Sequence, residues 1–272
     1  GFDYMRDRLG AYEVDELAVG SPFDYPSVAL LYLVNDIPEP GQRGYQNTVE
    51  ETLVDLFSAT EGRALALFTS YSQLKTTASA ITEPLAKEGI TVYAQGSGSS
   101  RAQLLESFRE EERVVLLGTR SFWEGVDVAG EALSCLVIAR LPFDVPTDPI
   151  ASARAEGYES PFHQYMVPEA ILRFMQGFGR LIRTATDQGI AVVLDRRLLS
   201  KGYGRRFTAS LPDPRVHVGS RSDLPAVAES WIEGLGMPAS VYGGAAFGED
   251  WDVANQETFP SEEGEPPWFW GA

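Results

Sequence analysis

Two arginines and a glutamine late in the chain have the types and spacing of a phosphate-binding row. Gln176, Arg180 and Arg183 follow one another at steps of four and three residues, which places them on one face of a helix. A guanidinium group presents a rigid fork of donors that matches phosphate oxygens. The commoner role of such a row is a solvated basic face on an amphipathic helix, so the row alone leaves both interpretations open.

The element that must carry this row is predicted as a helix over about residues 167–184. Pro168 suits the first helical turn, where its missing N–H costs nothing. Gly177 and Gly179 each cost about 1 kcal/mol in a helix relative to alanine, so we expect another backbone or a ligand to approach closely there. Glu169 and Arg173 share the polar face. The opposite, apolar face consists of Val167, Ala170, Ile171, Phe174, Phe178, Leu181 and Ile182.

Small hydroxyl side chains follow two apolar runs that are predicted as buried strands. Thr119 comes after the run 114–118, and Thr69 and Ser70 follow the run 63–69. Ligands of parallel sheets gather at the carboxyl ends of strands, and hydroxyls suit phosphate oxygens. Phe122 has two open interpretations, stacking on an unpaired base or filling the core. Trp123 is expected in the core.

The remaining elements alternate between strands and helices, which predicts an α/β fold with a mainly parallel sheet covered on both faces. Pro84 should kink or end the helix that contains it. Strands are expected over 28–34, 63–69, 90–94, 114–118, 134–140 and 190–195, and helices over 45–57, 71–85, 100–108, 150–157, 167–184 and 222–236.

The net charge and the cysteine content indicate which classes of protein remain possible. The formal net charge is −17, yet residues 170–210 hold eight basic residues and two acids, while residues 245–272 hold seven acids and no Lys or Arg. A nucleic-acid partner is therefore not excluded. There is no apolar run long enough to span a membrane. The one cysteine, Cys135, fits a reducing cytosol, so we expect a cytoplasmic protein. His163 and His217 do not suggest a metal site and are expected to be surface or hydrogen-bonded histidines.

Several segments together resemble a known family. QGFGRLIR (176–183) is similar to motif VI of the superfamily two helicases, Q-x-x-G-R-x-x-R, and SFWEGVD (121–127) resembles motif V of the DinG and XPD branch. Segments at 95–108, 116–133, 141–149 and 192–198 resemble that branch in the same order. The opening residues 1–25 resemble the segment beyond motif III. The resemblance covers about residues 1–212.

This resemblance implies the RecA-like fold of a second motor domain. It assigns residues 1–24 to a lead-in from a first motor domain, residues 25–236 to the second domain with motifs IV, V and VI, and residues 237–272 to an acidic extension that ends in aromatic residues. The partners that the resemblance implies are this first motor domain and single-stranded DNA.

The resemblance also implies a role for each site residue. Arg180 and Arg183 would reach the terminal phosphate of ATP, bound with Mg2+ between the two domains, and Gln176 would position the phosphate or the attacking water. Asp127 resembles the acid that holds the ribose hydroxyls, although a turn cap is an equal alternative from the residues alone. Nucleotide contacts are expected from Glu124, Gly125, Asp127 and Gly179, and DNA contacts from Thr69, Ser70, Gln95, Arg101, Thr119 and Phe122.

A missing motif limits the activity that this chain is expected to have alone. The sequence has no G-x-x-x-x-G-K-[ST] and no Gly-Lys dipeptide, so nothing in it would cradle the β- and γ-phosphates. The resemblance implies the second half of an ATP-dependent DNA helicase that moves 5′ to 3′ and takes part in DNA repair. Because the P-loop is missing, we expect this chain to be inactive alone. The resemblance leaves an iron–sulfur cluster open, because its cysteines would lie in the first motor domain. The alternatives are a non-catalytic nucleic-acid-binding or regulatory module of the same fold, and an unrelated α/β enzyme.

Overall fold

The computed structural model describes residues 3–17, 20–123, 133–145 and 148–238, and within these it contains a seven-stranded parallel sheet. The strand order is β3-β4-β2-β5-β6-β1-β7, and every pairing is parallel. The strands are β1 (Ala29–Val34), β2 (Ala64–Leu67), β3 (Thr91–Ala94), β4 (Val114–Gly118), β5 (Cys135–Ile138), β6 (Gly189–Val193) and β7 (Arg215–Gly219). All strands therefore end at the same edge of the sheet, which we call the carboxyl edge.

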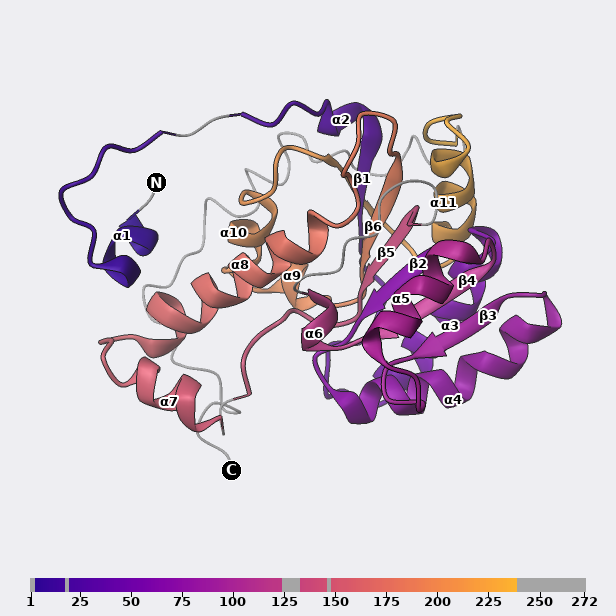
Figure 1. Cartoon of the computed structure of the whole chain (residues 1–272), viewed down its shortest axis with the longest axis horizontal. Coiled ribbons are helices and arrows are strands. Elements are labelled where there is room, and N and C mark those ends of the chain that lie inside the picture. The colour runs from indigo at the N-terminus through magenta and orange to yellow at the C-terminus, as the bar shows by residue number, and fades with distance from the viewer. Residues whose placement is uncertain (1–2, 18–19, 124–132, 146–147, 239–272) are drawn as a thin grey trace.

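Helices cover both faces of the sheet, as the alternation of strands and helices predicted. Figure 1 shows α3, α4 and α11 on one side of the sheet and α8 and α10 on the other. The longer helices are α3 (Tyr45–Ala59), α4 (Tyr71–Lys87), α5 (Arg101–Glu110), α8 (Val167–Phe178) and α11 (Leu224–Ile232). The shorter ones are α1 (Asp3–Leu9), α2 (Tyr25–Val28), α6 (Arg120–Trp123), α7 (Pro149–Ala155), the π-helix η1 (Phe162–Met166), α9 (Arg197–Ser200) and α10 (Gly204–Thr208).

Strand residues alternate between two apolar clusters because successive side chains point to opposite faces. Leu31 and Leu65 belong to the cluster under α8 and α5, whereas Leu30 and Ala66 belong to the cluster under α3, α4 and α11. The central strands are buried along their whole length. This explains why they appear in the sequence as continuous apolar runs rather than as alternating ones.

Two features differ from the sequence prediction, namely β7 and the end of α8. β7 was not predicted, because its residues alternate between buried and less buried positions at the edge of the sheet and do not form an apolar run. Pro84, which was expected to kink or end its helix, lies inside α4, and that helix continues to Lys87. The helix predicted over 167–184 ends at Phe178, where Gly179 is the C-cap. Arg180 and Arg183 therefore lie beyond α8 and not in a helical row with Gln176.

Candidate functional site

The first group of predicted contact residues lies at the carboxyl edge where β3, β4 and β2 are neighbours. Gln95 Oε1 accepts hydrogen bonds from both the amide and the hydroxyl of Thr119, each at 2.8 Å. The Nε2 of Gln95 donates to Ser121 Oγ at 3.2 Å. Strand pairing of β2 with β4 places Thr69 beside this pair, two residues after Leu67↔Gly118. The structure thus brings together side chains that are 24 to 50 residues apart in the sequence.

Ser70 begins α4 and caps it. Its Oγ accepts a hydrogen bond from Gln73 N at 3.3 Å, as is common for a serine in the N-cap position. The side chain is partly exposed, and its hydroxyl hydrogen stays available for an oxygen of a ligand. Capping of α4 and contact with a phosphate are therefore compatible roles for Ser70.

Arg101 and Phe122 also come together at this end of the sheet, but only Arg101 is accessible. Arg101 is the exposed first residue of α5, and its guanidinium carbon lies 5.6 Å from the centroid of the Phe122 ring. The Phe122 side chain is 0% exposed. A fully buried ring has no face for a base, so the prediction that Phe122 stacks on DNA is wrong. Trp123, at 2% exposure, packs in the core as expected.

The close approach predicted at Gly177 is made by a side chain and not by a ligand. A Cβ at Gly177 would lie 2.9 Å from the Trp123 ring and 3.3 Å from Leu67 Cδ1. Glycine therefore lets α8 pack against the segment that follows β4. A Cβ at Gly179 would lie 3.3 Å from Met175 O, so its nearest neighbour is a carbonyl of α8 itself.

The polar face of α8 contains less free positive charge than its sequence suggested. Arg173 donates to Pro142 O at 3.1 Å and to Asp144 Oδ2 at 2.7 Å, and its side chain is 12% exposed. Asp144 also lies 3.5 Å from Arg120 Nη1. Arg173 therefore holds the loop after β5 in place, whereas Gln176 is exposed. Asp144 carried no signal in the sequence, because its two arginine partners are 24 and 29 residues away.

Arg180 joins the two segments that resembled helicase motifs. Its Nη2 donates to the carbonyl oxygen of Trp123 at 3.1 Å. This bond fixes the residue that precedes Glu124, Gly125 and Asp127, which lie outside the described residues. The two segments are 57 residues apart in the sequence, and the fold places them in direct contact.

Arg183 begins a tight turn that a buried carboxylate organises. Asp187 Oδ2 accepts hydrogen bonds from the amides of Arg183 at 2.7 Å and Thr184 at 2.8 Å, and Asp187 Oδ1 accepts from the Thr184 hydroxyl at 2.6 Å. Asp187 is 7% exposed. Aspartates commonly bind nearby backbone amides in such turns, so Asp187 is a positioning residue that sequence reasoning missed.

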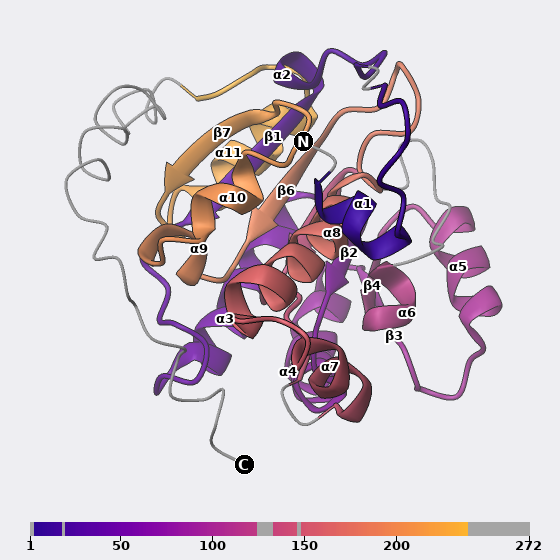
Figure 2. The ribbon, with the colours of Figure 1, turned by 90° about the vertical axis from the view of Figure 1, so that its left-hand side faces the viewer.

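The Gln95–Thr119 group and the turn that carries Arg183 lie in different parts of the domain. Leu181 packs directly over Gly189 at the start of β6, since a Cβ on Gly189 would lie 2.6 Å from Leu181 Cδ1. The turn that carries Arg183 is therefore near the edge at which the strands begin, and the Gln95–Thr119 group is at the carboxyl edge. Figure 2 shows α8 crossing the face of the sheet between β6 and α6.

The N-terminal helix contacts the same helix α8. Tyr4 donates to Glu169 Oε1 at 2.6 Å, and Arg8 Nε lies 3.8 Å from the same oxygen. Burial, together with the hydrogen bond to Glu169, raises the pKa of Tyr4. Figure 2 shows α1 beside α8.

A second buried ion pair stabilises the carboxyl edge between β5 and β6. Asp195 accepts hydrogen bonds from Leu141 N at 2.8 Å and from Arg197 Nη2 at 2.6 Å. Burial opposes the charge on Arg197, yet the hydrogen bond and the charge of Asp195 leave the Arg197 pKa raised. The sequence segment VVLDRRL was singled out by resemblance, but the role of Asp195 as a clamp was not predicted.

The two histidines have different environments. His163 is exposed, as expected, whereas His217 is buried on β7, and its Nε2 has no hydrogen-bond partner in the structure. The expectation of a satisfied histidine is therefore wrong for His217. In the described ranges, no group of three or more His, Cys, Asp or Glu side chains is arranged to hold a metal ion, and no helix could cross a membrane.

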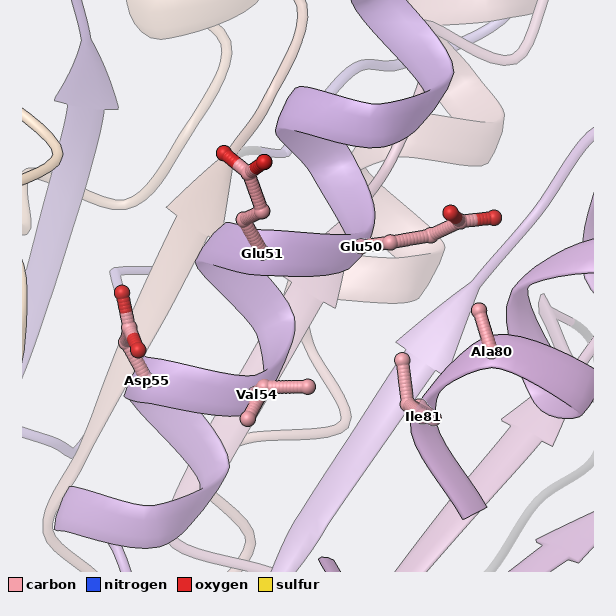
Figure 3. Close-up of a pocket in the computed structure, with 6 residues that line it drawn as sticks. All are labelled: Glu50, Glu51, Val54, Asp55, Ala80 and Ile81. Carbon is pink, nitrogen blue, oxygen red and sulfur yellow. The ribbon is translucent and has the colours of Figure 1, made fainter. Parts of the chain in front are cut away.

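A shallow groove of about 420 Å³ lies on the other face of the molecule, between α3 and α4. Figure 3 shows Glu50, Glu51, Val54 and Asp55 on one side and Ala80 and Ile81 on the other. Glu51 lies 3.4 Å from Arg221 Nη1, and Glu50 accepts a hydrogen bond from Gln46 at 2.6 Å. This groove is on the opposite face of the sheet from Arg180 and α8.

Known proteins are similar to this chain in sequence and in fold. A family model described as a helicase C-terminal domain matches residues 53–214. The ATP-dependent DNA helicase YoaA of Haemophilus influenzae is 38% identical over 216 residues, which make up 78% of this chain and 33% of that protein. The Bacillus subtilis protein named 3′-5′ exonuclease DinG is 34% identical over 235 residues, 83% of this chain and 25% of that protein.

The chain thus spans a quarter to a third of the length of these two relatives. A solved structure of XPD without ligand has a TM-score of 0.57 at 17% identity, and the match covers 80% of this chain and 46% of that one. That likeness supports the RecA-like fold. The family match includes β2, β4, α8 and both groups of site residues. It does not include β1 or β7. The chain therefore belongs to the family of helicase C-terminal domains, in the group with DinG and YoaA.

Proposed function

We propose that this chain is the second motor domain of an ATP-dependent DNA helicase of the DinG type, acting 5′ to 3′ on single-stranded DNA. The observation that carries the proposal is the hydrogen bond from Arg180 to the Trp123 carbonyl, which joins the two helicase-like segments. It supports a site in which residues on both sides of this bond face one bound nucleotide. The names of the YoaA and DinG relatives agree with this activity or with nucleic acid as the substrate.

The residues present suit the phosphates of a nucleotide better than a metal ion. Arg180 and Arg183 supply guanidinium donors, which bind phosphate oxygens and not cations. ATP with Mg2+ would supply the phosphoryl group whose hydrolysis drives movement, with Mg2+ held mainly by a first motor domain. Arg180 and Arg183 would stabilise negative charge on the terminal phosphate, and Gln176 would orient the phosphate or water.

The track for single-stranded DNA is assigned to the carboxyl edge. Thr69, Ser70, Gln95 and Thr119 present amide and hydroxyl groups from three neighbouring strands, and Arg101 adds an exposed cation. Groups of these kinds contact the phosphates and sugars of nucleic acids. The track excludes Phe122, whose ring is buried.

The test is ATP turnover by a polypeptide that contains this domain together with a first motor domain. Arg180→Ala is expected to lower kcat by about a thousandfold or more, the typical cost of losing an arginine finger. DNA affinity should change little. Arg154→Ala, which removes an exposed cation of α7, is the matched control and should retain full turnover.

Two results would overturn the proposal. Wild-type turnover by the Arg180→Ala variant would remove Arg180 from the phosphate. DNA-stimulated hydrolysis by the 272-residue chain alone would mean that its nucleotide site is complete without a second domain. A longer polypeptide that binds DNA but never hydrolyses ATP would instead favour the non-catalytic binding module, an alternative consistent with the exonuclease name of the Bacillus subtilis relative.

A further inference from the structure

A second group of cations lies at the carboxyl edge, beyond the proposed DNA track. Arg196, Lys201 and Arg206 come from the segment that follows β6, and all three side chains are exposed. We call them the α9–α10 patch. In the described structure, Arg196 and Lys201 make no ion pair or side-chain hydrogen bond, and the Nη1 of Arg206 donates to a carbonyl oxygen, that of His163, at 3.3 Å.

The neighbouring arginines 196 and 197 have opposite roles. Arg197 points inward, where Asp195 binds it at 2.6 Å and its guanidinium lies 5.6 Å from the Phe143 ring centroid. Arg196 points outward and is exposed. Arg197 therefore has a structural role, whereas no contact within the described fold uses the charge of Arg196.

The patch is held rigidly. Leu198 and Phe207 are buried, and the Phe207 ring packs edge-on against Phe174 of α8 at 5.4 Å between centroids. Gly204 allows α10 to contact α9 so closely that a Cβ there would lie 1.9 Å from Leu198 O. Cations on a fixed support lose less freedom when they bind a ligand.

The nearby carboxylates are already engaged. Asp195 binds Arg197, and Glu39 accepts a hydrogen bond from the Ser200 hydroxyl at 2.6 Å. Neither forms an ion pair with Arg196 or Lys201. Glu39 nevertheless places a negative charge beside the patch, which should weaken the attraction of any anion to it.

The patch is in line with the proposed track. β6 is separated from β2 by β5 alone, and neighbouring strands are about 4.8 Å apart, so the two strand ends are about 10 Å apart along the edge. That separation is comparable to a few nucleotide spacings of about 3.4 Å or more. A strand that passes Ser70 and Thr119 can therefore reach β6 without leaving the carboxyl edge.

We propose that the α9–α10 patch is a second phosphate-binding site for the same single strand, extending the track from β3-β4-β2 to β6. The inference rests on the proposed function, because it takes DNA to be the ligand of the carboxyl edge. Contacts of this kind are electrostatic and do not read sequence. They lengthen the bound segment and make its affinity depend more steeply on salt.

The experiment measures binding of a fluorescent oligothymidylate of roughly 20 nucleotides, longer than a typical single-strand site, by the 272-residue chain over a range of salt concentrations. Arg196→Gln with Lys201→Gln is expected to weaken binding roughly five- to tenfold at low salt. The slope of log affinity against log salt should fall by about 1.4, since each lost contact to a single strand removes about 0.7. Glu39→Gln, which keeps an oxygen for Ser200, should tighten binding.

The matched control is Lys87→Gln with Arg109→Gln. These two exposed cations lie near the ends of α4 and α5, helices that run back toward the opposite edge of the sheet. The control removes the same charge and should leave the salt slope unchanged. Equal slopes for the wild-type chain and for the Arg196→Gln, Lys201→Gln variant would overturn the patch, as would an equal loss in the control.

A further variant separates this inference from the proposed function. Ser70→Ala with Thr119→Ala should weaken binding of the same oligonucleotide. If that variant binds more weakly while the patch variant binds as wild type, the track stands and the patch alone is rejected. If the wild-type chain binds no oligonucleotide at low salt, both the track and the patch are wrong.

Discussion

At the scale of single residues, the site depends on carboxylates that hold arginines and backbone in place. Asp144 binds Arg173, Asp195 binds Arg197, and Asp187 binds the amides of Arg183 and Thr184. Each of these carboxylates is buried or nearly so. Arg173 and Arg197 therefore have structural roles, whereas we assign Arg180 and Arg183 to the binding of phosphate.

Asp187→Ala tests the turn that carries Arg183. The substitution leaves two buried or half-buried amides and a hydroxyl without their acceptor, which should cost about 2 kcal/mol of unfolding free energy. Urea unfolding of the 272-residue chain measures this loss. Asp55→Ala, at an exposed aspartate of α3, is the control for loss of charge. An unfolding free energy equal to that of the wild type would mean that Asp187 does not organise the turn.

At the scale of elements, the edge strand β7 contains a buried group that its neighbours do not satisfy. His217 lies against the Tyr32 ring at 5.1 Å between centroids, and burial lowers its pKa, partly offset by the charge of Asp223. A lowered pKa in the folded state means that the unfolded chain binds this proton more readily. Stability from this group is therefore full above the ordinary histidine pKa of about 6.5 and is lost as the pH falls below it.

His217→Leu should remove that dependence. Between pH 7.5 and pH 5.5 the wild-type chain is expected to lose more unfolding free energy than the variant, by at most about 1.4 kcal/mol for each pH unit below about 6.5. Chemical unfolding at the two pH values measures both losses, and the carboxylates common to both chains cancel in the comparison. Parallel losses in the two chains would show that His217 is not the group responsible.

At the scale of the whole molecule, α11 packs on the same face of the sheet as α3 and adds buried residues to that apolar cluster. Trp231 of α11 is 3% exposed and donates to Gly189 O at 2.9 Å, which completes the face that α3 and α4 begin. We therefore propose that the domain comprises residues 25–236 and that residues 237–272 are an extension. The three aromatic residues near the C-terminus and the acids before them lie outside the described residues.

Removal of residues 239–272 tests this boundary. The deletion takes away seven acidic residues and no basic one, and the thermal unfolding midpoint should stay within about 2 °C of that of the full chain, because the buried core residues of the described ranges all precede residue 239. Differential scanning calorimetry of both chains gives the midpoints. A decrease of about 5 °C or more would place part of the extension inside the folded unit.

The sequence by itself determined the fold class and indicated which segments form the candidate site. Central strands of a parallel sheet are buried on both faces, so β1, β2 and β4 appear as apolar runs, and the spacing in QGFGRLIR and SFWEGVD indicated the family. The apolar character of a strand is a property of consecutive residues, so it can be identified directly from the sequence.

Only the tertiary structure decided which of the candidate residues remain available. Phe122 is buried because Gly118 and Arg101 lie against it, and Arg173 is taken by Asp144, 29 residues earlier. α8 ends at Phe178, and the chain beyond it places Leu181 over Gly189 at the start of β6. These outcomes depend on contacts between distant residues, which periodicity and spacing do not encode. The strand order, which places Gln95 beside Thr119, has the same cause.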